Sequence, residues 1–482
     1  NGFWGPLLSW ILIPFISFKI NHFTAINIIS AITGILALIG IRQLSFKFKI
    51  STAIRNAIIV CSLPIVVQSS LIETQDFILV ALLIYYLNIM LRKDYATRHG
   101  LAAAAGVIGA LAYFCKSYAF PFFLAHFTGT HLFLLFSSNG SSAKKKVIIT
   151  AITGLAVFAA ISAGWIAQVS DKYGHFAFST TGKNNMAAMG PEAQGEDSSN
   201  PIYGREEGWP IFYEGLLEPV NETATSAWED PTYLKMKPWS PLSSAYHFKH
   251  FANLIFKNIS QGVKILNLYS SLTFAIIFAY ILLCIRPLKD LLRRPDIILP
   301  LFTISLYTAG YMLVHMEVRY LQFVNIVVLL MGGHILFRLF KTSFFSSPLR
   351  RKTLIFLFII SFIIMPVRSV IKRGHYVEDL HSLSRELRND FHVSGNIASN
   401  KEYLGVNNSW HNTFRLAFHL DSKYYGQARD MISDSELLEE FEKYNINYYF
   451  IWGENQRIPE FLQQKVEVTQ GRIPGLKIYH VQ

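Results

Sequence analysis

A few charged residues interrupt an otherwise apolar chain, and their types indicate where chemistry could occur. Glu73 and Asp76 lie three positions apart, so a helix would carry both carboxylates on one face. Carboxylates placed in this way can hold a divalent cation or act as a general base. Lys116 and Arg319 each stand at the end of an apolar block. A lysine there can bind a phosphate as a point charge, and an arginine can bind it with a bidentate fork.

Each of these residues also has a purely structural interpretation. Asp76 precedes an apolar run and would be a good helix cap. Lys116 can extend its amine to the membrane interface and have no other role. Arg319 can pair with Glu317, although its place beside Tyr320 at the start of an apolar block also suits phosphate binding at a helix N-terminus. The residue types alone leave these alternatives open.

Aromatic residues form a second group of candidates, because ring faces can stack on sugars. Trp4 stands in the opening segment near the non-aromatic Pro6, a further candidate, whereas Trp209 and Tyr213 stand in a long hydrophilic stretch. Together with Glu317, they are the residues we expect to line a substrate site. The alternatives are that the tryptophans anchor the chain at the membrane interface or only pack the loop.

The composition shows which kind of chain must position these residues. Of 482 residues, 51% are hydrophobic and only 16% are charged, whereas soluble domains usually carry about 25% charged residues. This excludes a soluble enzyme, a fibrous protein and a disordered chain. The net charge of +12 does not indicate a nucleic-acid partner, because no arginine-rich helix or basic-aromatic module is present. Phosphate-binding glycine loops and the common hydrolase motifs are also absent from the sequence.

The apolar residues fall in blocks of about 20, which is the length that crosses a bilayer. The predicted spans are 23–41, 56–70, 76–91, 101–115, 118–136, 147–169, 263–285, 297–314, 320–340 and 353–371. With these spans, the five basic loops all fall on one side of the membrane, which marks that side as cytoplasmic. We therefore expect a multi-pass membrane protein, and the absence of paired cysteines from the external stretches favours the plasma (inner) membrane.

The same topology places two hydrophilic stretches outside, the loop 170–262 and the tail 372–482. The tail alternates helix and strand signals. Ser433 and Glu436 stand at capping-box spacing before an acidic helix, and residues 447–452 and 476–481 are β-prone. The predicted fold is a polytopic α-helical membrane domain, residues 1–371, followed by an extracytoplasmic α/β domain, residues 372–482.

The order of these motifs resembles a known family. The chain opens with Asn-Gly-Phe-Trp-Gly-Pro-Leu-Leu-Ser-Trp and continues with Glu-Thr-Gln-Asp, Phe-Cys-Lys-Ser-Tyr and a late Glu-Val-Arg-Tyr before the external tail. It resembles the C-type integral-membrane glycosyltransferases that use polyprenyl-phosphate sugars. That group includes the protein O-mannosyltransferases and the lipid A aminoarabinose transferases. The resemblance covers nearly the whole membrane part.

The resemblance assigns roles to particular residues. The segment 4–6 matches an aromatic, proline-containing segment of the first external loop. Asp76 matches an acidic residue before a later span, although Gln75 replaces the usual proline. Lys116 and the Arg319-Tyr320 pair match positions that cluster around the lipid phosphate or a metal, so a divalent cation is the only cofactor that the resemblance suggests.

The family's catalytic acid lies upstream of the Trp-Pro segment, after a first transmembrane helix. The chain begins at Asn1, in what reads as the middle of a loop. We therefore expect the catalytic acid upstream of Asn1 and assign its role to no other residue.

The implied function is transfer of a sugar from a polyprenyl-phosphate donor to an acceptor hydroxyl on the extracytoplasmic side, with inversion at the anomeric carbon. The partners would be this lipid-linked sugar, the bilayer and an acceptor that is a glycan, a lipid or a protein. A transporter or flippase of a lipid-linked glycan and a non-catalytic membrane scaffold are the alternatives.

Overall fold

The computed structural model describes residues 2–71, 74–191, 215–233, 238–285, 287–291, 294–404, 407–429 and 432–482. Glu73, Trp209 and Tyr213 lie outside these ranges, so their roles stay predictions. The chain forms two compact units. One joins Gly2–Thr181 to Ala252–Lys372, and the other joins Gly182–Phe251 to Arg373–Gln482.

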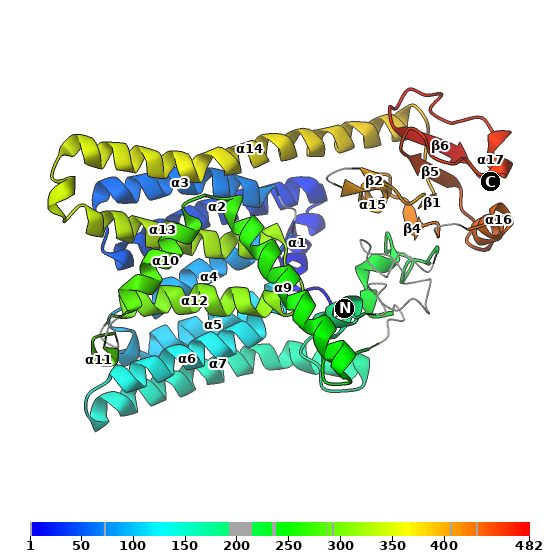
Figure 1. The fold of residues 1–482 in the computed structure, drawn as a ribbon. Helices are drawn as coiled ribbons and strands as arrows, with labels where there is room; N and C mark the ends of the chain where they lie inside the picture. Colours follow the sequence, from blue (N-terminus) through cyan, green and yellow to red (C-terminus); the bar gives the residue numbers. More distant parts are fainter. Residues whose placement is uncertain are drawn as a thin grey trace. The chain divides into compact units, whose positions relative to one another are not determined.

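The first unit is a bundle of helices. It contains α1 (Leu7–Ser17), α2 (His22–Ser45), α3 (Thr52–Ser70), α4 (Asp76–Met90), α5 (His99–Cys115), α6 (Ala119–Ser137), α7 (Ser141–Tyr173), α10 (Thr273–Cys284), α11 (Leu288–Leu291), α12 (Pro295–Met312) and α13 (Gln322–Leu339). Two long helices, α9 (Ala245–Asn267) and α14 (Pro348–Asn389), belong to it for most of their length. Figure 1 shows α3 to α7, α12 and α13 running roughly parallel.

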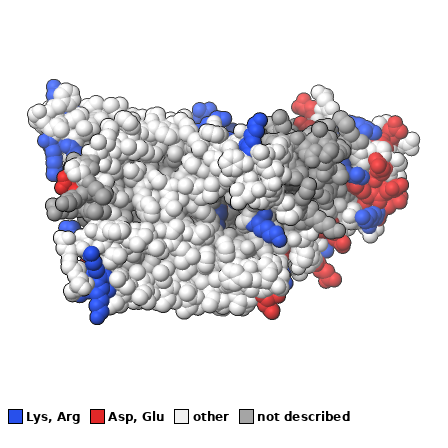
Figure 2. Space-filling view, turned by 60° about the horizontal axis from the view of Figure 1, so that its bottom comes forward, with Lys and Arg blue, Asp and Glu red and all other residues white. Residues whose placement is uncertain are grey.

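The surface of this bundle is suited to lipid. Among the described residues, six helices are long and apolar enough to cross a membrane, namely those within His22–Phe48, Thr52–Ser70, Ala119–Ser137, Ser141–Tyr173, Val318–Leu339 and Pro348–Lys372. Figure 2 shows a broad face of the bundle that is nearly free of charged atoms, with Lys and Arg side chains at one end. The prediction of a polytopic helical membrane protein is confirmed.

One predicted span is wrong as a single helix. The segment 263–285 is divided, because α9 ends at Asn267 and α10 begins at Thr273. Ser270 lies in the break, where its buried hydroxyl is 2.6 Å from that of Ser361 and accepts a hydrogen bond from the backbone N–H of Leu272. These side-chain bonds offer the backbone an alternative to the helix. Hydropathy alone did not indicate this, because the flanking residues are apolar on both sides.

Small residues let the helices of the bundle approach closely. A Cβ at Gly106 of α5 would lie 2.4 Å from the carbonyl oxygen of Gly154 on α7. Gly154 itself faces the ring of Phe127 on α6, where a Cβ would lie 2.3 Å from the ring. Because lipid tails are as apolar as the helices, such close backbone packing is a main source of attraction between helices in a membrane.

The second unit contains a four-stranded sheet of order β4-β1-β5-β6. Its strands are β1 (Asn396–Ser399), β4 (Lys423–Gln427), β5 (Tyr448–Trp452) and β6 (Leu476–His480), and a separate pair is formed by β2 (Tyr403–Leu404) and β3 (Asn407–Asn408). β1 runs parallel to β4 and β5, whereas β6 is antiparallel to β5. Further helices are α8 (Thr181–Ala188), α15 (Ser409–His419), α16 (Asp434–Lys443) and α17 (Glu460–Gln463).

Helices cover both faces of this sheet. Leu416 of α15 packs in one apolar cluster with Ile397 and Phe450, and Phe441 of α16 packs in another with Tyr449. Neighbouring residues of a strand point to opposite faces, so the two clusters lie on the two sides of the sheet. The predicted α/β fold of the tail is confirmed, as are the two β-prone segments. The capping box at the start of α16 is also present.

The contact between α5 and α7 leads to a test of the bundle packing. Gly106→Ala should lower the free energy of unfolding by about 1–3 kcal/mol, because the new methyl group meets backbone that cannot easily move. Thermal unfolding of the purified protein in detergent measures this loss. Gly164→Ala in α7 is the matched control, since no described atom lies within 4 Å of a Cβ at that position. Equal stability of the two variants would contradict the proposed close contact.

Candidate functional site

Three turns at the same end of the bundle carry the predicted charged residues. α4 begins at Asp76, and α5 ends at Cys115, immediately before Lys116. A short 3-10 helix, η6 (Val318–Leu321), contains Arg319 and leads into α13. Because α4 packs against both α5 and α13, the start of α4, the end of α5 and the start of α13 are brought together.

Asp76 is the centre of this cluster. Its side chain is only 8% exposed, and the Lys116 amine donates a hydrogen bond to Oδ1. Arg319 Nη1 lies 3.6 Å from Oδ2, and the Thr74 hydroxyl donates a bond of 3.1 Å to the same oxygen. A buried carboxylate needs such partners, since an unpaired charge in a low-dielectric site is strongly unfavourable.

A second carboxylate holds Arg319 in place. Arg319 Nε lies 2.8 Å from Glu317 Oε2, and its Nη2 lies 3.2 Å from Oε1. The Tyr320 hydroxyl donates a bond of 2.9 Å to Oε1, and His315 Nε2 lies 3.5 Å from the same atom. The bidentate pair fixes the plane of the guanidinium group as well as its position.

Tyrosine rings form one wall of the cluster. The Lys116 amine lies 3.7 Å from the centre of the Tyr320 ring, a cation–π contact. Tyr320 stacks on Tyr311 with ring centres 4.5 Å apart, and Tyr311 in turn lies 4.2 Å from Tyr118. The rings limit the directions in which the lysine amine can turn.

The opening segment lies beside the turn that carries Lys116. A Cβ at Gly5 would lie 2.3 Å from the carbonyl oxygen of Cys115, so this approach requires glycine. Pro6 is buried and directly precedes α1, whereas the side chain of Trp4 is 38% exposed. Trp4 and Pro6 are therefore near the charged cluster in the fold, although their substrate-lining role stays a prediction.

The surroundings shift the pKa values of two groups that lie outside the membrane spans. Burial alone would raise the pKa of Glu317, but the hydrogen bond from His315 and the charge of Arg319 outweigh it and hold that pKa well below its usual range. Glu317 is therefore ionised at neutral pH. Burial lowers the pKa of the Lys116 amine below its usual value, with the opposing attraction of Asp76 smaller than the effect of burial.

The geometry decides among the structural alternatives. The residue before α4, Gln75, makes no side-chain cap, and Asp76 is engaged by cations, so helix capping does not explain it. Lys116 turns inward and is only 19% exposed, so it does not reach for the interface. The expected pairing of Arg319 with Glu317 is present, and Arg319 contacts Asp76 in addition.

Sequence reasoning did not find the tyrosine wall. Tyr307, whose ring centre lies 5.5 Å from that of Tyr118, also belongs to this wall. Tyr307 and Tyr311 are four residues apart and therefore share one face of α12, which was a usable signal. The participation of Tyr118 depends on packing between helices, since its hydroxyl donates a bond of 2.8 Å to the backbone carbonyl of Tyr307, 189 positions away.

The described residues alone do not complete a site for a divalent cation at Asp76, and a metal there stays a prediction. Both of its carboxylate oxygens face cationic side chains, Lys116 and Arg319. The described part of the chain contains no group of three or more His, Cys, Asp or Glu side chains arranged to hold a metal. The predicted partner of Asp76 in such a site, Glu73, lies outside the described residues.

Fold and site together define a class: a multi-pass membrane protein with a cluster of paired charges at one end of its helical bundle and a separate α/β unit. Residues 4–165 match the model of a family described as dolichyl-phosphate-mannose-protein mannosyltransferase. The match includes the opening segment, Asp76 and Lys116, and it confirms the resemblance predicted for this part of the chain. The comparison with curated proteins found no match.

Solved structures share the fold. The archaeal oligosaccharyltransferase AglB from Archaeoglobus fulgidus, in complex with an inhibitory peptide and a dolichol-phosphate, gives a TM-score of 0.51 at 10% identity over 94% of this chain and 61% of that chain. A crystal structure of the Archaeoglobus fulgidus oligosaccharyltransferase with Zn and sulfate gives 0.53 at 12% identity, over 94% and 59%. The chain thus spans about three fifths of the length of these proteins.

The buried ion pairs lead to a stability prediction. Asp76→Asn should lower the free energy of unfolding by about 3 kcal/mol or more, because the cations of Lys116 and Arg319 lose their shared counter-charge in a buried place. Thermal unfolding in detergent measures the loss.

A matched control is Asp94→Asn. Asp94 also contacts two cations, Arg92 and Arg98, but its side chain is 35% exposed, so the loss there should stay below about 1 kcal/mol. A loss at Asp76 no larger than the loss at Asp94 would show that the Asp76 cluster is not electrostatically buried.

Proposed function

We propose that the chain is a glycosyltransferase that moves a sugar from a polyprenyl-phosphate donor to an acceptor hydroxyl on the extracytoplasmic side of the membrane. One observation carries the proposal: Lys116 and Arg319, from distant parts of the chain, meet at Asp76 at one end of a membrane bundle. The family match over residues 4–165 and the shared fold support this assignment.

The two cations retain hydrogen-bond donors for a phosphate. A lysine amine has three N–H donors, and one of those of Lys116 is directed to Asp76. A guanidinium group has five N–H donors. Arg319 uses Nε and Nη2 for Glu317, and Nη2 also donates to the Tyr320 hydroxyl. Its Nη1 faces Asp76, so one N–H of Nη1 remains for a phosphate. The carboxylates thus act as positioning groups, which hold the cations in place while leaving part of each cation available to the donor phosphate.

The proposed reaction is a single displacement. The acceptor oxygen attacks the anomeric carbon and forms the new glycosidic bond, while the bond from that carbon to the phosphate oxygen breaks. Its electron pair leaves with the polyprenyl phosphate, whose added negative charge Lys116 and Arg319 stabilise. A carboxylate that the resemblance places upstream of Asn1 removes the acceptor proton. One displacement inverts the configuration at the anomeric carbon.

The charges of the loops support the assignment of the reaction to the extracytoplasmic side of the membrane. Basic loops lie preferentially on the cytoplasmic side of a membrane, which assigns the end of the bundle with Lys47, Arg92 and Arg351 to the cytoplasm. The Asp76 cluster lies at the other end of α4. We infer that the site faces the extracytoplasmic side of the plasma (inner) membrane and that the C-terminal α/β unit lies on that side. The acceptor there is a glycan, a lipid or a protein.

Arg319 is the residue that tests the mechanism. Arg319→Ala should reduce turnover roughly a hundredfold or more, because a preorganised charge at the leaving phosphate is lost. Arg319→Lys should retain part of the activity, since it keeps the charge but not the fork. Arg350→Ala, which removes an exposed arginine from the basic end, should leave transfer unchanged. Wild-type transfer by Arg319→Ala would remove Arg319 from the mechanism.

The assay also separates the three functional classes. The purified protein is reconstituted in vesicles with radiolabelled polyprenyl-phosphate sugar, and product and lipid are followed together. Covalent transfer of the label to an acceptor supports the glycosyltransferase. Movement of the lipid across the vesicle without transfer supports a transporter or flippase, and neither event supports a scaffold.

A further inference from the structure

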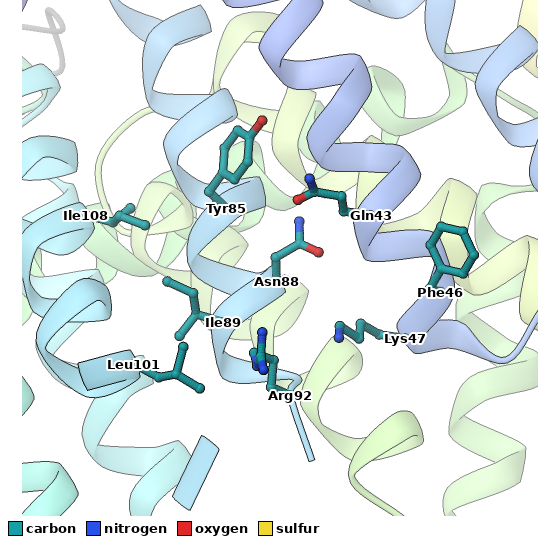
Figure 3. A pocket seen from close by; sticks show the side chains of 9 residues that line it. All are labelled: Gln43, Phe46, Lys47, Tyr85, Asn88, Ile89, Arg92, Leu101 and Ile108. Carbon is teal, nitrogen blue, oxygen red and sulfur yellow. The ribbon is translucent and has the colours of Figure 1, made fainter. Parts of the chain in front are cut away.

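A cavity with polar groups lies at the opposite end of the bundle from the Asp76 cluster. It is about 540 Å³ in volume and opens between α2, α4 and α5 (Figure 3). Asp76 begins α4, whereas Arg92 follows its end, so the two sites are separated by roughly 24 Å along the helix axis at 1.5 Å per residue. The cavity is therefore not part of the proposed transfer site.

Helices α2 and α4 are in close contact next to the cavity. A Cβ at Gly40 of α2 would lie 2.8 Å from the Ile84 side chain on α4, so the two helices touch there. The buried Asn88 amide donates hydrogen bonds of 2.9 Å to the carbonyl of Gly40 and 3.1 Å to that of Ile84. Beyond this contact, Gln43 and Lys47 on one side and Arg92 on the other line the open space.

The outer part of the cavity is cationic. Lys47, in the 3-10 helix η1 (Phe46–Phe48), and Arg92 extend their side chains into the same space in Figure 3. Asp94 accepts from Nε and Nη2 of Arg92 at 2.9 Å each and also lies 2.9 Å from Nε of Arg98. This one carboxylate thus serves two arginines. The described residues provide no ion-pair partner for Lys47, so a net positive charge remains.

One side of the cavity is apolar. Ile89 from α4 and Leu101 and Ile108 from α5 line it, together with the ring of Tyr85. Leu101 and Ile108 are seven residues apart, so they lie on the same face of α5 and extend the wall by roughly 10 Å. Phe46 at the mouth is 53% exposed on a surface suited to lipid. The cavity combines a cationic mouth with an apolar wall that runs along the membrane-spanning helices.

We propose that this cavity binds an anionic glycerophospholipid from the leaflet at the basic end of the bundle. The phosphate lies between Lys47 and Arg92, the Gln43 amide faces the glycerol backbone, and one acyl chain follows Leu101 and Ile108. A free inorganic anion would leave the apolar wall unused. A zwitterionic lipid would bring a second positive charge to a mouth whose one described carboxylate, Asp94, already serves two arginines.

Native mass spectrometry of the full chain released from detergent tests the assignment. The probes are phosphatidylglycerol, phosphatidylcholine with the same acyl chains, and inorganic phosphate. We expect retained phosphatidylglycerol and little phosphatidylcholine on the wild type, with no displacement by inorganic phosphate. Lys47→Gln/Arg92→Gln should weaken phosphatidylglycerol binding roughly tenfold or more, because each basic residue near the surface contributes to attraction of anionic lipid.

Lys145→Gln/Lys352→Gln is the control, because it removes two exposed lysines from other basic loops and lowers the net charge by the same amount. It should bind phosphatidylglycerol as the wild type does. Equal binding by the two double variants would overturn the proposal, and so would displacement of the lipid by inorganic phosphate, which would indicate a simple anion site.

Two further measurements keep the test valid if the Lys47→Gln/Arg92→Gln variant is poorly folded. Ile108→Trp narrows the cavity at its apolar wall without changing the charge and should also weaken lipid retention. Its thermal unfolding is compared with that of the wild type to show that the variant is folded. A phosphatidylglycerol with a photoreactive acyl chain should label peptides that contain residues 85–108 in the unmodified protein. Labelling confined to other helices would overturn the proposal. None of these readouts requires sugar transfer, so they are independent of the proposed enzymatic function.

Discussion

A carboxylate at the edge of the membrane bundle is unfavourable unless cations accompany it, and Asp76 is 8% exposed. Its partners come from two other parts of the chain, Lys116 after α5 and Arg319 before α13. The electrostatic requirement of one side chain therefore fixes three turns relative to one another. The helices that meet there, α4, α5 and α13, run through the rest of the bundle, so the same ion pairs also help to set its packing.

The second carboxylate, Glu317, restricts the orientation of the Arg319 guanidinium group. If Arg319 contacted Asp76 alone, its guanidinium could turn with the loop that carries it. The bidentate bond to Glu317, together with the Tyr320 hydroxyl, holds it in one orientation. Preorganised donors of this kind need no rearrangement when charge develops on a phosphate. A neutral cluster of paired charges is thus compatible with a site for an anionic group, because the pairing uses only part of each cation's donors.

The two ends of the bundle differ in their charge and in the side chains that they present. At one end, paired charges and tyrosine rings make a compact polar cluster around the buried carboxylate of Asp76. At the other end, basic residues outnumber acidic ones, and an open cavity with an apolar wall is lined by residues of α2, α4 and α5. Between the ends, glycines such as Gly106 and Gly154 bring backbones together in the absence of a hydrophobic driving force.

The sequence by itself determined the membrane-spanning bundle, the basic end and the α/β tail. These features depend on local quantities, namely the hydropathy of blocks of residues, the charge of short loops and the period of apolar positions, all of which the chain carries without reference to its fold. The charged candidates Asp76, Lys116 and Arg319 were also visible, because a charge at the edge of a membrane span away from the basic loops is costly to bury and therefore indicates a function.

Only the tertiary structure decided how these residues are paired. Lys116 and Asp76 are 40 positions apart, and no spacing rule relates them, since their contact depends on which helices become neighbours. The same reason explains the tyrosine wall, where Tyr118 reaches α12, and the break between α9 and α10, where buried hydroxyls replace helical hydrogen bonds. Local patterns place a residue along its helix, whereas packing between helices decides what it meets.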